Sequence, residues 1–161
     1  MKKIYLTLAS LLFLASCATY KAKYASPFNG KPFKTDKEVA HTFYLIGDAG
    51  KSPMNDLNPA LKQFKVRLDK ADKNSTVIFL GDNIYPAGFP DENDVAYKEA
   101  KWHLDAQLKT LESYKGNTVF IPGNHDWYSN GLKGLKREEK YIEEALKGKD
   151  VFAPQNGCPI E

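Results

Sequence analysis

The sequence predicts an α/β fold with a mixed sheet and flanking helices. Three short apolar runs, each followed by a turn that contains glycine, alternate with three longer segments of helical periodicity. This alternation is typical of parallel strands joined by crossover helices. The chain has 161 residues, of which 42% are hydrophobic, 12% aromatic and 27% charged, so wholesale disorder is excluded and one domain with a buried core is expected.

The expected strands are short runs rich in β-branched and aromatic residues. They are Thr42–Ile46, Thr76–Leu80 and Thr118–Ile121. Because each run is apolar on both faces, we expect buried strands in a sheet that helices cover on at least one side.

The expected helices follow the strands in order. The first has Asn58 as its cap and Pro59 as its first residue. The second runs from about Asp94 to Tyr114, and the third from about Leu132 to Lys147, where Gly148 ends it. The side chains expected on the buried stripes of the three helices are Leu61, Phe64, Leu68 and Ala71, then Val95, Trp102, Leu108 and Leu111, and finally Leu135, Ile142, Ala145 and Leu146.

Residues 1–16 are typical of an export signal, with two lysines before the apolar run Ile4–Leu14. As a helix this run would span only about half of a bilayer core, so it is too short for a transmembrane segment. The ending Leu14-Ala15-Ser16-Cys17 resembles the lipobox of bacterial lipoproteins, which implies cleavage before Cys17 and acylation of that cysteine. The alternative is an ordinary signal peptide with a chance cysteine.

Residues 17–40 are then expected to be the lipidated cysteine and a lysine-rich tether. The lipid would hold the protein at the bacterial cell envelope, on the outer membrane or the cell surface, so the membrane is one expected partner. Without the two lysines of the leader, the formal net charge falls from +3 to +1. This low charge argues against nucleic acid as a partner.

Polar residues follow each predicted strand at the point where it ends. They are Gly47-Asp48, Gly81-Asp82 and Gly123-Asn124-His125. The carboxyl ends of neighbouring strands lie about 4.8 Å apart at the functional edge of an α/β sheet, so these side chains are expected to share one site. Oxygen ligands suit hard cations, and the sequence therefore predicts a metal site at this edge.

The three motifs carry a resemblance. Gly47-Asp48-Ala49-Gly50, Gly81-Asp82-Asn83-Ile84-Tyr85 and Gly123-Asn124-His125-Asp126 resemble the first three signatures of the calcineurin-like metallophosphoesterases, over roughly residues 41–157. The spacings of 34 and 42 residues suit one βα unit each. The resemblance implies a domain at 41–161 that forms the first half of a four-layer αββα sandwich. It also implies an enzyme for metal-dependent hydrolysis of phosphate esters.

The resemblance also assigns roles to single residues. Asp48 and Tyr85 would bind the first metal, Asp82 would bridge both metals, and Asn124 would bind the second. His125 would be catalytic, because in the family it contacts the phosphate and assists the leaving oxygen. The cofactors implied are two divalent or trivalent ions, with iron beside iron, zinc or manganese, that activate a shared water.

Tyr85 gives the second motif a similarity to purple acid phosphatases, where the tyrosine is a phenolate ligand of ferric iron. The alternative is that Tyr85 only packs beside Pro86. Asp126 has two interpretations as well, as a residue that orients the imidazole of His125 or as a cap of the turn.

The family pattern needs further histidines in V-x-x-H and G-H-x-H motifs, and the chain has only His41, His103 and His125. His41 is expected at the surface, before the first strand, and His103 in helix packing. We therefore expect the N-terminal part of a longer domain, whose remainder is a further partner. A loop from Phe152 and the unpaired Cys158 favour the same interpretation, and an apolar sheet face could stay uncovered.

Three functions remain open at this point. The first is phosphomonoesterase activity on a small phosphorylated substrate, and the second is phosphodiesterase or nucleotidase activity on the same core. The third, if Glu161 is a true end, is a binding module on an envelope lipoprotein without turnover.

Overall fold

The computed structural model describes residues 37–148 and 150–156. The chain divides after Glu38 into two units, and the fold described below is that of the second. The predicted leader, Cys17, most of the tether and Cys158 lie outside the described residues. In the part of the chain that is described, no helix has both the length and the apolar character needed to cross a bilayer.

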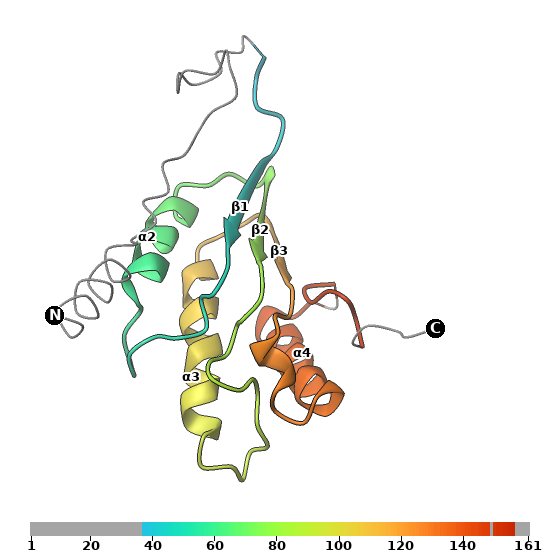
Figure 1. Cartoon of the computed structure of the whole chain (residues 1–161). Coiled ribbons are helices and arrows are strands. Elements are labelled where there is room, and N and C mark those ends of the chain that lie inside the picture. The colour runs from blue at the N-terminus through green and yellow to red at the C-terminus, as the bar shows by residue number, and fades with distance from the viewer. Residues whose placement is uncertain (1–36, 149, 157–161) are drawn as a thin grey trace, which may run out of the picture. The chain divides into compact units, whose positions relative to one another are not determined.

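The three expected strands form one sheet, and each is followed by a helix. The elements are β1 (Thr42–Ile46), α2 (Pro59–Leu68), β2 (Ser75–Phe79), α3 (Tyr97–Leu108), β3 (Asn117–Phe120) and α4 (Leu132–Leu146), with single 3₁₀ turns η1 (Lys109–Leu111) and η2 (His125–Trp127). The strand order is β1-β2-β3, and both strand pairs in the described residues are parallel. Figure 1 shows the strands side by side. The α/β fold class is thereby confirmed.

The register of the sheet decides which strand residues enter the core. Ile46 pairs with Phe79, and Phe79 with Phe120. Paired residues point to the same face, and the rings of Phe79 and Phe120 stack at 4.1 Å, fully buried. Buried residues of all three helices join this face in one apolar core.

The opposite face of the sheet is exposed in the described part of the chain. Its most exposed side chains are Phe43, Leu45 and Leu80, at 62%, 56% and 50%. The expectation that an apolar sheet face could stay uncovered is therefore confirmed for these residues. A second sheet on this face remains a prediction.

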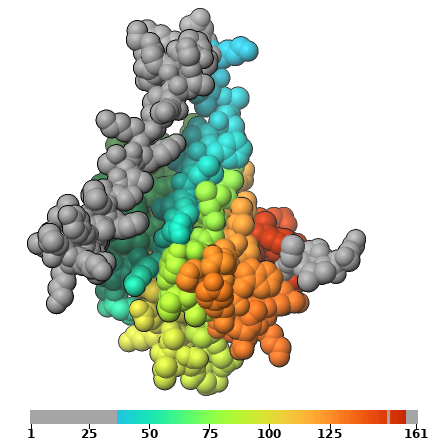
Figure 2. Space-filling view, viewed as in Figure 1, coloured from blue at the N-terminus to red at the C-terminus, as the bar shows by residue number. Residues whose placement is uncertain are grey.

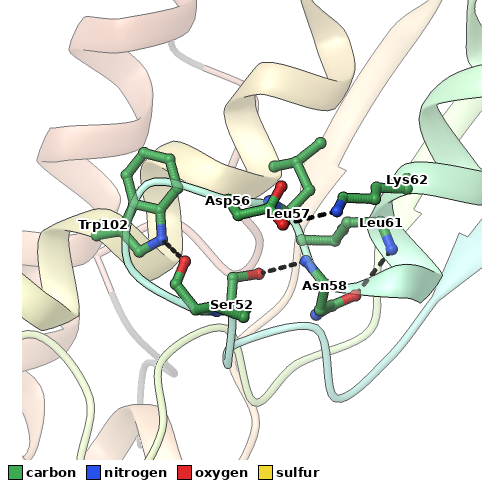
Figure 3. A network of polar contacts seen from close by, with 8 residues as sticks. Ser52, Asp56, Leu57, Asn58, Leu61, Lys62 and Trp102 are labelled. Atoms are coloured by element: carbon green, nitrogen blue, oxygen red, sulfur yellow. Dashed lines mark hydrogen bonds and ion pairs between the residues drawn. The ribbon is translucent and has the colours of Figure 1, made fainter.

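The segment after β1 is tied to both neighbouring helices (Figure 3). Asn58 caps α2, because its side chain accepts from the backbone N–H of Leu61 at 2.9 Å. Ser52 Oγ accepts from the backbone N–H of Asn58 at 3.2 Å, and the indole N–H of Trp102 on α3 donates to the carbonyl of Pro53 at 2.7 Å. These contacts fix the loop that leads away from the first predicted ligand.

Some boundaries and burial predictions were wrong. Helix α3 begins at Tyr97 rather than near Asp94, and Val95 is fully exposed because it lies in the turn before the helix. Ala145 on α4 is exposed as well. Phe152 was expected in a loop, but it forms a parallel bridge with Phe120 and is buried.

Candidate metal centre

The ends of the three strands converge as the motifs predict. Beyond the paired residues of the last register, Asp48, Asp82 and Asn124 stand two, three and four positions further along their strands. In Figure 2 the segments that follow the strands, coloured from cyan through lime to orange, lie against one another.

Backbone hydrogen bonds join the first two loops. The N–H of Asp48 donates to the carbonyl of Gly81 at 3.1 Å, and the N–H of Gly50 donates to that of Asp82 at 3.0 Å. The N–H of Tyr85 returns a bond to the carbonyl of Gly50 at 2.9 Å. A Cβ at Gly50 would overlap the backbone of Asp82, so only glycine permits this approach.

Both aspartates have a left-handed backbone conformation. The φ angle is 53° at Asp48 and 52° at Asp82. Apart from asparagine and aspartate, L-residues rarely adopt this conformation, and strained residues of this kind gather at functional sites. The two aspartates therefore share one backbone conformation, while of the glycines before them only Gly81 has a positive φ, at 99°.

The phenol of Tyr85 lies between the two carboxylates. Its oxygen is 2.6 Å from Asp48 Oδ1 and 2.8 Å from Asp82 Oδ2. A phenol has one hydrogen to donate, while three oxygens meet here with two negative charges. This set is short of positive charge, and a hard cation between the oxygens would supply it. The residues present therefore fit a metal ion.

The protonation of Tyr85 depends on this charge. The hydrogen bonds to Asp48 and then Asp82 raise the pKa of the phenol well above its ordinary value, so in this arrangement it keeps its proton at neutral pH. A bound cation would act in the opposite direction, because it favours the phenolate. In the described residues no group of three or more His, Cys, Asp or Glu side chains gathers, because the third oxygen here is a phenol.

The third loop orients Asp82 from the other side. The backbone N–H of His125 donates to Asp82 Oδ1 at 3.0 Å. A Cβ at Gly123 would meet the same carboxylate, so the close approach depends on that glycine. Both oxygens of Asp82 are thus engaged, Oδ2 with Tyr85 of its own motif and Oδ1 with the third motif.

The imidazole of His125 lies beside the cluster, between two aromatic rings. Its centroid is 4.4 Å from that of Tyr85 and 4.9 Å from that of Tyr128. His125 Nδ1 is 2.6 Å from the carbonyl oxygen of Pro86. A carbonyl can only accept, so Nδ1 carries the hydrogen, and Nε2 is left as the atom that can face a ligand.

Asn124 is exposed and lies beside His125 at the start of η2. Its amide nitrogen donates to the hydroxyl of Tyr128 at 2.8 Å. This contact engages the nitrogen of the amide and not the oxygen, which is the atom that binds metals. The structure therefore brings Asp48, Asp82 and Tyr85 into direct contact, and it places Asn124 at the edge of the same site.

Asp126 holds the turn rather than the imidazole. Its carboxylate is fully buried and accepts from the backbone N–H groups of Gly123 at 2.7 Å, Ile84 at 3.0 Å and Asn83 at 3.2 Å. These bonds join the second and third motifs. Of the two interpretations of Asp126, the contacts are those of turn capping, since the carbonyl of Pro86 orients His125. Burial raises the pKa of Asp126, and the three N–H donors oppose that shift.

The other two histidines lie outside the cluster. His41 is exposed next to the start of β1, and its Nε2 contacts Thr76 Oγ1 at 2.9 Å. His103 is buried in α3, where burial lowers its pKa and favours the neutral ring. Both positions agree with the sequence interpretation.

Sequence reasoning missed the buried polar residues beneath the site, namely Asn83, Gln107 and Glu138. Glu138 had a detectable signal, because it lies on the apolar stripe of α4 between Leu135 and Ile142, where a carboxyl group is out of place.

One of the comparisons with known proteins found a match, and it covers the fold described above. The family model for calcineurin-like phosphoesterases matches residues 41–158. The chain therefore belongs to the calcineurin-like phosphoesterase family. Membership of this family indicates metal-dependent hydrolysis of phosphate esters in general. Neither a curated protein nor a solved structure matched the chain.

Proposed function

We propose that the protein is a phosphomonoesterase of the purple acid phosphatase type. The observation that carries the proposal is the phenol of Tyr85, which contacts the carboxylates of both Asp48 and Asp82. A tyrosine in this place favours ferric iron at one of two metal positions, with iron, zinc or manganese at the other. When bound, the metal pair would acidify a shared water and neutralise the phosphoryl oxygens.

The chain's own residues would orient the substrate and supply a proton. Asp48, Asp82 and Tyr85 would hold the first metal, Asp82 would reach both, and Asn124 would hold the second through its amide oxygen. The Nδ1–H group of His125 would stay hydrogen-bonded to the carbonyl oxygen of Pro86. In the protonated ring, the second proton, on Nε2, could then pass to the leaving oxygen of the ester.

The test of this function compares two substrates. The full-length gene product, stripped with a chelator and reloaded with iron plus zinc or manganese, is assayed on p-nitrophenyl phosphate and on bis(p-nitrophenyl) phosphate. We expect hydrolysis only after reloading, with a higher kcat/KM for the monoester. A higher value for the diester would overturn the monoesterase assignment, and no hydrolysis of either ester would favour a binding module.

The role of Tyr85 has a spectroscopic test that does not depend on turnover. The iron-loaded wild-type protein is expected to be purple, and Tyr85→Phe is expected to abolish the visible absorption band, because the phenolate is one partner in the charge transfer. Tyr128→Phe is the matched control, since it removes another phenol beside the site and should keep the band. A band that persists in Tyr85→Phe would contradict phenolate ligation.

We also propose that Cys17 is lipidated and holds the protein at the bacterial envelope. The support is the lipobox-like sequence Leu14-Ala15-Ser16-Cys17. In cells fed a labelled fatty acid, the wild-type protein is expected to carry label and to sediment with membranes. Cys17→Ser should lose the label and leave the membrane fraction, whereas equal membrane association of the two proteins would refute the anchor.

A further inference from the structure

A buried polar cluster lies beneath the metal centre, and it consists of Asn83, Gln107, Asp126 and Glu138. All four residues are fully buried, and they come from the loop after β2, from α3, from η2 and from α4. Asn83 directly follows Asp82 in the chain, so the cluster is attached to the loop that carries two of the predicted ligands.

The side chain of Asn83 is held through its nitrogen. Asn83 Nδ2 donates to the carbonyl of Ile121 at 2.9 Å and to Glu138 Oε1 at 3.1 Å, and Asp126 Oδ2 is further away at 3.4 Å. In the backbone, the carbonyl of Asn83 accepts from Gln107 Nε2 at 2.7 Å. The loop is thus anchored to the residue that follows β3, to α3 and to α4.

Three oxygens of this cluster have no hydrogen-bond partner within the described residues, namely Gln107 Oε1, Asn83 Oδ1 and Glu138 Oε2. The last two lie on side chains that hydrogen-bond each other. A buried polar atom without a partner destabilises the folded state, because it has lost its hydrogen bonds to water. Asn83 Oδ1 and Glu138 Oε2 thus belong to groups that already share one hydrogen bond, and both are acceptors when the carboxyl is ionised. A single proton on Glu138 Oε2 would give both of these oxygens a partner and would leave Gln107 Oε1 as it is.

We propose that Glu138 is a protonated acid whose Oε2–H donates to Asn83 Oδ1, and that this acid–amide pair makes Glu138 a positioning residue for the loop carrying Asp82 and Tyr85. The pair then has two antiparallel hydrogen bonds, one in each direction. The functional half of this proposal rests on the proposed phosphoesterase activity.

The proton belongs to Glu138 rather than to Asp126, because their donors differ. Asp126 accepts from the backbone N–H groups of Gly123, Ile84 and Asn83, which stabilise a carboxylate. Glu138 receives one neutral amide donor. Complete burial and the nearby charge of Asp126 raise the pKa of Glu138 well above its usual range, which agrees with this assignment.

Three variants separate the pair from a general structural role. Glu138→Gln keeps a donor and an acceptor in the same places and so keeps the pair without a titratable proton. Glu138→Leu keeps the volume and removes the pair. Glu144→Gln is the matched control, because Glu144 lies on the same helix with its side chain 66% exposed.

The first measurement is the infrared spectrum at neutral pH. The carbonyl band of a protonated carboxylic acid is expected in the wild-type protein and in Glu144→Gln, and it should be lost in Glu138→Gln. Absence of this band from the wild-type spectrum, or its persistence in Glu138→Gln, would overturn the proposal. This measurement does not depend on turnover. If the protein is inactive, the proposed function is contradicted, but the infrared spectrum still tests the acid–amide pair.

The second measurement is kcat and KM of the metal-loaded full-length product with p-nitrophenyl phosphate. Glu138→Leu is expected to lower kcat by about tenfold or more with little change in KM, since residues that orient ligands typically cost about 10–100-fold when removed. Glu138→Gln is expected to recover most of that loss. Equal losses in the two variants, or none in Glu138→Leu, would overturn the positioning role. If Glu138→Leu fails to fold, a tenfold or larger loss of kcat in Glu138→Gln would overturn the positioning role.

Discussion

Replacing Asp82 with asparagine is expected to lower kcat of the metal-loaded full-length product by more than about a hundredfold and to remove bound metal. The change keeps the size of the side chain but removes its charge. An amide N–H₂ in place of Oδ1 would face the backbone N–H of His125, donor against donor. In place of Oδ2 it would donate to the phenol of Tyr85, whose own hydrogen can go to Asp48. The measurement is kcat on p-nitrophenyl phosphate together with elemental analysis of metal per protein.

The control for this variant is Asp56→Asn. Asp56 is an exposed aspartate in the loop after β1, paired with Lys62 at 2.7 Å (Figure 3). Exposed ion pairs of this kind contribute little to stability, so metal content and kcat should stay at the wild-type values. If Asp82→Asn kept its metal and its kcat, the bridging role of Asp82 would be rejected.

The order of strands and helices was predictable because apolar runs and helical periodicity are local properties of the sequence. Asn58-Pro59 marked the start of α2 correctly, since a cap and a first-turn proline act within a few residues. The burial of Val95 was predicted wrongly. The helical period of 3.6 residues extends back to Val95 in the sequence, but residues Asp94–Ala96 form a turn and α3 begins only at Tyr97. Helix boundaries depend on such turns more than on periodicity.

Which face of the sheet is covered was not predictable from apolar runs alone. Phe43 and Leu45 are as apolar as Ile46, yet only the face of Ile46 meets the helices. The register with β2 decides this, because it aligns Ile46 with Phe79, and register is a long-range property.

At the site, the glycine-linked aspartates were predictable, and their supports were not. Tyr85 lies three residues after Asp82, and its phenol contacts the carboxylate of that residue. The phenol also contacts Asp48, because the parallel strands place the two loops next to each other. The carbonyl of Pro86 that orients His125 is a backbone group, present in every residue, so no sequence pattern could single it out. The roles of these residues in catalysis stay predictions.

The clearest prediction for His125 compares two leaving groups. His125→Ala is expected to lower kcat by about 10²–10⁴-fold with β-glycerol phosphate, whose alkoxide needs a proton as it leaves. The loss with p-nitrophenyl phosphate is expected to be smaller, because p-nitrophenolate is stable without one. His41→Ala is the control, since His41 is exposed at the start of β1 and should leave both rates unchanged.

The ratio of the two losses separates proton donation from binding. A histidine that only holds the phosphate would stabilise the transition states of both esters by the same contact, so its removal would cost the same factor with each substrate. Equal factors would therefore contradict the role of Nε2 as the proton donor while keeping His125 at the phosphate. We expect a larger factor for the alkyl ester, because the hydrogen bond from Nδ1 to Pro86 leaves Nε2 as the ring nitrogen able to deliver the proton.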